Sequence, residues 1–194
     1  MANPKADLLR YLQIGRDVML WKLDGLGEYD IRRPLTPTGT NLLGLVKHLA
    51  GVEMIYFGVV FARPVADPPA WLADESESNV DMWAKPEESR EDIVGLYRRA
   101  WAHSDATIGA LELDTPGHVP HWAPRRNPVT LHQILVHVVA ETHRHAGHAD
   151  LLREHLDGAA GHRPETGNLP EEEREWWADY RDRLEQAARQ AAGR

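Results

Sequence analysis

The segment from about residue 41 to about residue 62 is apolar on nearly every side, and it limits the folds open to this chain more than any other stretch. A helix with apolar residues all round has no face for water and must lie deep inside a bundle. Its apolar positions are Leu42, Leu43, Leu45, Val46, Leu49, Val52, Ile55, Tyr56, Val59 and Val60. Thr40 or Asn41 can cap its start, because their short side chains accept hydrogen bonds from free backbone amides. The sequence therefore predicts a central helix surrounded by others.

Three further segments show the 3.6-residue period of amphipathic helices, with proline and glycine clusters between them. The first begins after Asn3, a suitable N-cap, and breaks at Gly25. The other two span about 88 to 113 and about 131 to 156, and Thr130 is placed to cap the last one. Strand patterns are hard to find. Helices without strands indicate a helical bundle.

The connections between these helices are long in two places. Residues 63 to 86 are rich in proline and acidic residues, and residues 118 to 128 hold prolines, histidines, a tryptophan and two arginines. A charged segment at about 170 to 191 adds a further helix with an aromatic face. We therefore predict an all-α fold, a four-helix bundle with long connections and an extra C-terminal helix. The prediction is a single domain over residues 1–194, with the bundle at about 5–157.

Composition excludes several classes of protein. The chain is 42% hydrophobic and 27% charged, which favours a globular fold over disorder. Its net charge of −8 and the lack of a basic patch argue against nucleic-acid binding. No secretory signal is visible at the start. No stretch is expected to reach the about 20 apolar residues of a membrane helix, and the longest candidate runs from Gly51 to Phe61. We expect a cytoplasmic protein with no membrane partner.

Two ionisable residues interrupt the apolar stripe of the last bundle helix. Glu141 and His145 are four residues apart and therefore share one helix face. His48 lies within the apolar run NLLGLVKHLAGVEMIYFGVV. Burying such groups unpaired costs several kcal/mol, so a metal ion held by His48, Glu141 and His145 is one explanation. The alternative is that Glu141 and His145 only hydrogen-bond each other in a wet groove. The chain has no cysteine, so thiolate ligands are excluded.

The last bundle helix contains further histidines that are not equivalent. His137 lies one turn before Glu141, slightly off the apolar stripe, and His148 lies one turn after His145. Either is a candidate general base, and His148 is also a candidate fourth ligand or a partner that orients a ligand. His143 and His155 fall off the stripe and are expected to be solvated.

These residues carry a resemblance to a known family. The segments LVKHLAGVE and VHVVAETHRHAGHADLLRE resemble the DinB-like superfamily of metal-binding four-helix bundles over about residues 5 to 157, and an actinobacterial-type branch of it. The resemblance implies that His48, Glu141 and His145 are the metal ligands. Glutamate at the middle position differs from the commoner histidine, but mycothiol-dependent maleylpyruvate isomerase of the same superfamily is similar in having glutamate there. The branch that the chain resembles is related to this isomerase and to thiol S-transferases.

Three protein ligands leave a coordination position open for water or substrate, as in catalytic sites. Two histidines and one carboxylate suit Zn by default, with Ni, Co, Mn or Fe as alternatives. The resemblance implies a thiol cosubstrate such as mycothiol, which a metal would hold as thiolate. Our main hypothesis is a thiol S-transferase or isomerase acting on a small electrophile. The alternatives are a metal-dependent hydrolase and a non-catalytic bundle that binds a metal or small ligand.

Several residues are candidates for contacts with such a substrate. The arginines suit a carboxylate or an array of hydroxyl groups, although a solvated surface charge is the alternative for each. The candidates are Arg125, Arg126, Trp122, His121 and Arg153. The aromatic C-terminal segment, with Trp176 and Trp177, suits packing of its own helix or a homodimer contact.

Overall fold

The computed structural model describes residues 3–73, 77–163, 169–170 and 172–194. The chain forms two compact units, Met1–Ala160 and Gly161–Arg194. The first is a helical bundle, and the second contains one helix. The assignment of the whole chain to a single domain stays a prediction.

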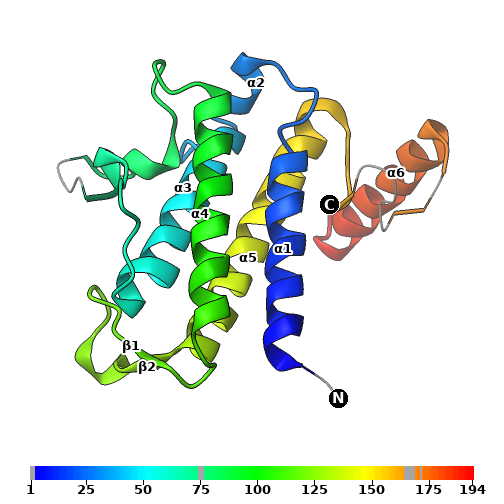
Figure 1. Ribbon diagram of the computed structural model, residues 1–194. Helices are drawn as coiled ribbons and strands as arrows, with labels where there is room; N and C mark the ends of the chain where they lie inside the picture. Colours follow the sequence, from blue (N-terminus) through cyan, green and yellow to red (C-terminus); the bar gives the residue numbers. More distant parts are fainter. Residues whose placement is uncertain (1–2, 74–76, 164–168, 171) are drawn as a thin grey trace. The chain divides into compact units, whose positions relative to one another are not determined.

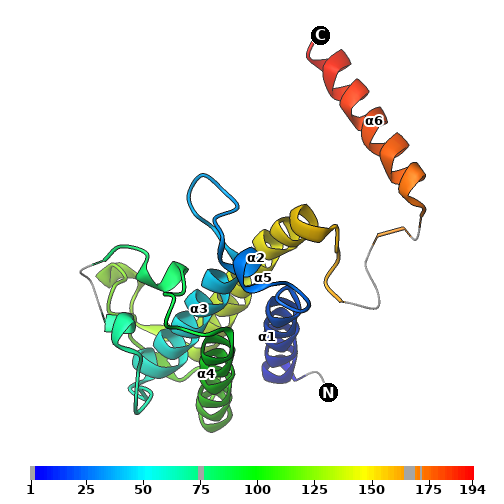
Figure 2. The same ribbon diagram turned by 90° about the horizontal axis from the view of Figure 1, so that it is seen from above.

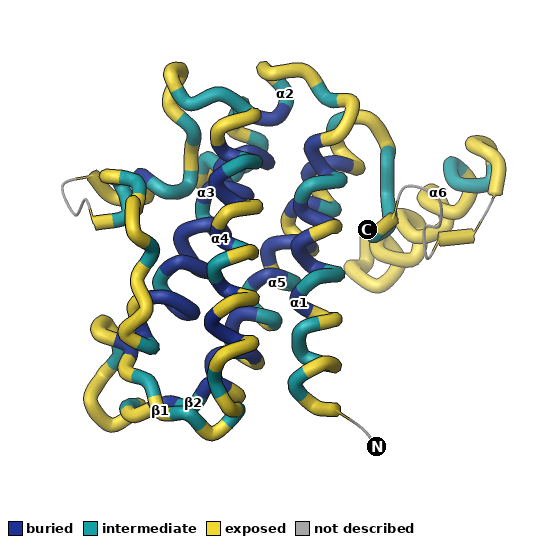
Figure 3. The backbone as a smooth tube through the Cα atoms, in the orientation of Figure 1, coloured by how far each residue is buried: buried dark blue, intermediate teal, exposed yellow. Residues whose placement is uncertain are grey.

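The bundle is built from four long helices, α1 (Pro4–Trp21), α3 (Leu42–Glu53), α4 (Arg90–Ala110) and α5 (Leu131–Asp157). α1 packs along α5, while α3 packs against both α4 and α5. α1 and α5 run in one direction and α3 and α4 in the other (Figure 1). Buried residues lie where these helices face one another (Figure 3). The predicted all-α bundle is confirmed.

The predicted caps are present. The side chains of Asn3, Asn41 and Thr130 each accept a hydrogen bond from a backbone amide three residues on, at the starts of α1, α3 and α5. α5 ends at Gly158, whose φ of 79° is left-handed and suits glycine. Local polar chemistry therefore sets where these helices begin and end.

The most apolar helix does not stay α-helical to its end. After α3 the chain forms a π-helical turn, Met54–Gly58, and a 3-10 turn, Val59–Phe61. The stretch Leu42–Phe61 is long and apolar enough to span a membrane by length and composition, with a mean hydropathy of 1.5, so the expectation that no stretch qualifies is wrong. Its window is 83% buried inside the protein, as expected for the core helix of a bundle.

The connection between α3 and α4 lies outside α3, on the side away from α1 (Figures 1 and 2). It contains two 3-10 turns, Ala70–Ala73 and Val80–Met82. The connection between α1 and α3 contains a short helix, α2 (Glu28–Arg32).

The connection between α4 and α5 is a loop whose two ends pair with each other. β1 (Pro116–Gly117) pairs antiparallel with β2 (Val129–Thr130), a two-residue ladder that the sequence pattern did not predict. Between them lies a 3-10 turn, Pro124–Arg126. The side chain of Asn127 exchanges two hydrogen bonds with the backbone of Val119, at 2.9 and 3.0 Å. These bonds hold the loop in a defined shape at one end of the bundle.

The second unit contains α6 (Arg174–Ala191), the predicted extra C-terminal helix. Its aromatic side chains pack on each other, with the rings of Trp176 and Tyr180 stacked at 5.2 Å and those of Trp176 and Trp177 edge-on at 4.9 Å. No described residue of α6 is buried within the chain.

Candidate metal centre

His48, Glu141 and His145 converge where α3 faces α5. One ligand atom from each lies within 4.8 Å of the other two. The Oε1 atom of Glu141 is 3.0 Å from Nε2 of His145 and 3.7 Å from Nε2 of His48. The two imidazole rings meet edge-on, with centroids 4.8 Å apart. The fold thus brings His48 of α3 to two residues of α5, Glu141 and His145, that lie far from it in sequence.

This geometry fits a divalent cation. Two ligand atoms that each lie about 2.0–2.1 Å from zinc in a tetrahedral site are roughly 3.3 Å apart. The distances of 3.0 and 3.7 Å bracket that separation. The Glu141–His145 contact is also a hydrogen bond, as the alternative interpretation requires. That alternative does not explain why His48 directs its Nε2 at the same carboxylate.

Asp81 holds His48 from the opposite side. Its Oδ2 atom lies 2.7 Å from Nδ1 of His48, so the carboxylate accepts a hydrogen bond from that nitrogen. A proton on Nδ1 leaves the lone pair of a neutral imidazole on Nε2, the atom that faces Glu141. The hydrogen bond from His48 lowers the pKa of Asp81. Asp81 was not among the predicted site residues, because a lone aspartate in a long connection carries no periodic signal.

The protonation states of the other two residues also suit a metal. Burial favours a neutral Glu141, but the charges of His145 and His48 outweigh it and lower the pKa of the carboxyl group. Burial, followed by the nearby His48, lowers the pKa of His145. A carboxylate and a neutral imidazole are the forms that bind metal ions.

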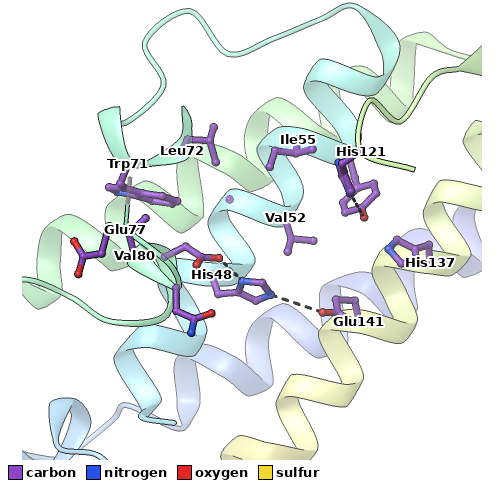
Figure 4. Close-up of a pocket in the computed structure, with 14 residues that line it drawn as sticks. His48, Val52, Ile55, Trp71, Leu72, Glu77, Val80, His121, His137 and Glu141 are labelled. Atoms are coloured by element: carbon purple, nitrogen blue, oxygen red, sulfur yellow. Dashed lines mark hydrogen bonds and ion pairs between the residues drawn. The ribbon is translucent and has the colours of Figure 1, made fainter. Parts of the chain in front are cut away.

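A cavity of about 430 Å³ opens beside this cluster (Figure 4). His48 and Glu141 form part of its wall. Its other lining side chains combine apolar groups from α3 and the α3–α4 connection with two histidines. Among the lining residues are Val52, Ile55, Trp71, Leu72, His121 and His137. A volume of this size suits a small molecule.

Tyr56 gives the cavity a polar group away from the metal ligands. It lies on the π-helical turn after α3, and such turns are frequent at functional sites. Its hydroxyl is 3.2 Å from Nε2 of His121, and its ring meets that of His137 at 4.7 Å. Burial raises the pKa of Tyr56 and burial lowers the pKa of His137. Tyr56 was predicted only as a core residue, because its spacing matches that of the apolar residues around it in the sequence.

The loop between α4 and α5 contributes three predicted residues near this wall. His121 lines the cavity, and the ring of Trp122 packs against His137 at 5.1 Å. The guanidinium of Arg126 stacks over the ring of Trp122 at 3.9 Å. Arg125 is exposed on the same turn.

The predicted site residues His148 and Arg153 are not among the described residues that line the cavity. His148 is exposed, and its Nδ1 atom lies 3.4 Å from Nδ1 of His145. Arg153 is buried and donates hydrogen bonds to the carboxylate of Asp157 and to the backbone oxygens of Lys22 and Asp24. Arg153 therefore joins the end of α5 to the end of α1, and a substrate contact by Arg153 stays a prediction.

The fold and this site define a four-helix bundle with three candidate metal-binding residues beside a cavity of about 430 Å³. A family model described as Mycothiol-S-transferase matches residues 7–158. The chain therefore belongs to the mycothiol S-transferase family, in agreement with the resemblance found in α3 and α5. No curated protein matches the chain.

Proposed function

We propose that this protein is a metal-dependent transferase that joins the sulfur of mycothiol to a small electrophile. The observation that carries the proposal is the cluster of His48, Glu141 and His145 beside a cavity, in a chain of the mycothiol S-transferase family. Zinc is the proposed metal, with Ni, Co, Mn or Fe as alternatives.

The proposed ligands set the charge of the centre. Glu141 contributes one negative charge and the two imidazoles are neutral, so a centre with a divalent ion keeps a net charge of about +1. Such a centre attracts an anion and, when the metal is bound, stabilises thiolate over thiol. The sulfur must come from outside the chain, because the sequence contains no cysteine.

The cavity walls supply groups for the electrophile. A new sulfur–carbon bond forms, and either a leaving group departs with its electron pair or the attacked molecule takes up the pair and then a proton. The Tyr56 hydroxyl stays protonated and can donate a hydrogen bond to an oxygen of the electrophile. The neutral imidazole of His137 is our candidate for proton transfer. His121, Trp122 and Arg126 are the proposed substrate contacts, with Arg125 at the rim.

His148 has a different proposed role. Its contact with Nδ1 of His145 makes it a partner that orients a ligand rather than a base in the cavity. A homodimer and a cytoplasmic location stay predictions.

The test is a conjugation assay with purified, zinc-loaded protein, mycothiol and an alkylating or arylating electrophile. Mass spectrometry measures the thioether product. We expect product formation that requires zinc, is lost in His145→Ala, and persists in His155→Ala. His155 is a matched control, because it is an exposed histidine on the same helix. Ester hydrolysis without any thiol would support the hydrolase instead, and zinc binding without any turnover would support a non-catalytic bundle.

A further inference from the structure

We infer that Asp81 is a positioning residue that couples the metal centre to one wall of the cavity. Residues 77–83 form the wall segment. In this interpretation His48 helps to hold the wall segment in place, and the wall segment helps to orient the imidazole of His48. The inference rests on the proposed metal centre.

The first line of support is the orientation of His48. Asp81 accepts a hydrogen bond from Nδ1 at 2.7 Å, while Nε2 faces Glu141. The imidazole is therefore held by Asp81 at one nitrogen and directs the other at Glu141. Carboxylates in this position fix the ring and the tautomer of metal-binding histidines and make them better ligands. Asp81 is only partly buried, with 34% of its side chain exposed, so burial alone does not explain its placement.

The second line of support is the way α3 anchors the residues that follow Asp81. The side-chain amide of Asn41 donates a hydrogen bond to the backbone oxygen of Met82 at 3.1 Å. The buried ammonium of Lys47 donates one to the backbone oxygen of Trp83 at 3.0 Å. Lys47 directly precedes His48 in α3. These two adjacent residues therefore bind Trp83 and Asp81 of the wall segment.

Gly44 provides independent evidence that this approach is close. A side chain at position 44 would overlap the backbone oxygen of Met82. Glycine is therefore required where the wall segment crosses α3, one turn before His48. The anchoring contacts leave Asp81 little freedom to lie elsewhere.

The wall segment also forms part of the cavity. Glu77, Asn79, Val80 and Asp81 line it, and Figure 4 shows Val80 and Glu77 on the side of His48 away from Glu141. A metal ion bound by His48 would thus restrict the wall that substrate contacts. The coupling is reciprocal. If the bound metal favours this position of the wall segment by some factor, displacing the wall segment weakens metal binding by the same factor.

The experiment compares zinc affinity in the full chain, measured by competition with a chromogenic chelator. Second-layer partners of this kind typically change metal affinity about 10–100-fold. We expect Asp81→Ala to lose affinity within that range while still binding one zinc ion, and Asp81→Asn to lose less, because an amide oxygen still accepts the hydrogen bond. Glu77→Ala is the matched control, a carboxylate of the same wall outside the ligand cluster, and should keep wild-type affinity.

Gly44→Ala tests the coupling without altering Asp81 or His48, and it should also weaken zinc binding. Hydrogen exchange supplies a second readout. Zinc should slow amide exchange in residues 77–83 of the wild type and of Glu77→Ala, but not of Asp81→Ala.

Three outcomes would overturn the inference. Equal zinc affinity in Asp81→Ala and the wild type would overturn it and leave the metal centre intact. Complete loss of zinc in Asp81→Ala, with the helical circular dichroism spectrum retained, would make Asp81 a ligand rather than a positioning residue. Absence of zinc binding by the wild type would overturn the proposed metal centre as well.

Discussion

The Arg16–Glu53 cluster and the cluster of His48, Glu141 and His145 differ in how completely their charges are paired. In the first, Arg16 of α1 places its guanidinium against both carboxylate oxygens of Glu53, at 2.8 and 2.6 Å. Both side chains are almost fully buried, and Asp105 accepts a further bond from Arg16 at 2.9 Å. This arrangement is bidentate, and the pair is enclosed.

The second cluster is the metal candidate, and its pairing is incomplete. One carboxylate, Glu141, faces two imidazoles, and two members of the cluster line a cavity. Ionisable groups are shielded from solvent in both clusters, almost fully in the first and partly in the second, so burial alone does not indicate function. Ligand atoms that converge on one point beside a cavity are what distinguish the second.

The largest effect is expected when the buried Arg16–Glu53 pair is broken. Arg16→Met leaves Glu53 buried without its partner, which should cost about 3–5 kcal/mol of unfolding free energy. The double variant Arg16→Met/Glu53→Leu should recover much of that loss, because apolar residues can replace a buried ion pair. Urea denaturation measures both. Equal stability of the single and double variants would contradict the structural role. Zinc stoichiometry of the folded fraction should stay unchanged.

A smaller effect is expected when metal is added or removed. Zinc at about 100 times its Kd should stabilise the wild type by about 2.7 kcal/mol, because it binds only the folded state. His145→Ala should fold but gain little from zinc. Thermal denaturation with zinc and with a chelator measures the difference. Equal stabilisation of both proteins would show that zinc binds elsewhere.

The variant His148→Ala tests whether the partner of His145 matters less for zinc binding than Asp81, the partner of His48. His48 is backed by a carboxylate at 2.7 Å, whereas His145 is backed by an exposed imidazole at 3.4 Å. We therefore expect a loss of zinc affinity at or below the lower end of the about 10–100-fold range, and smaller than that of Asp81→Ala. Chelator competition ranks the two variants, and the reverse order would contradict this assignment.

The smallest effect concerns Arg153 and its partner. The hydrogen bond from Arg153 lowers the pKa of Asp157. This carboxylate therefore adds stability above its unfolded pKa of about 3.9, and the gain is lost as the pH falls through the lowered folded value. Asp157→Asn should cost less than about 1 kcal/mol at pH 7, because the site is partly exposed, and nothing in strong acid. Denaturation at both pH values measures this, and a difference that grows in acid would contradict it.

The sequence was sufficient to predict the bundle and the proximity of the three candidate ligands. The spacing of hydrophobic residues along the sequence indicates which helix faces are buried. N-caps such as Asn41 and Thr130 are recognisable because their side chains bind backbone amides only three residues on. Glu141 and His145 share a face by helix geometry alone. His48 was identifiable because a histidine in so apolar a helix needs a partner.

The contacts that depend on long connections were not predictable in this way. Asp81 reaches His48 across 33 residues, and Tyr56 lines the cavity from a π-helical turn that has no sequence period. Arg153 donates hydrogen bonds to backbone oxygens at the end of α1, about 130 residues earlier in the chain, and tertiary packing alone brings them together. In each case the deciding partner is distant in sequence.

The most direct measurement is the zinc content of the purified protein and of His48→Ala, Glu141→Ala and His145→Ala, each checked for folding by circular dichroism. His155→Ala is again the control. We predict one equivalent of zinc in the wild type and the control, and a clear loss in each of the three variants. Full zinc stoichiometry in all three folded variants would contradict the proposed centre.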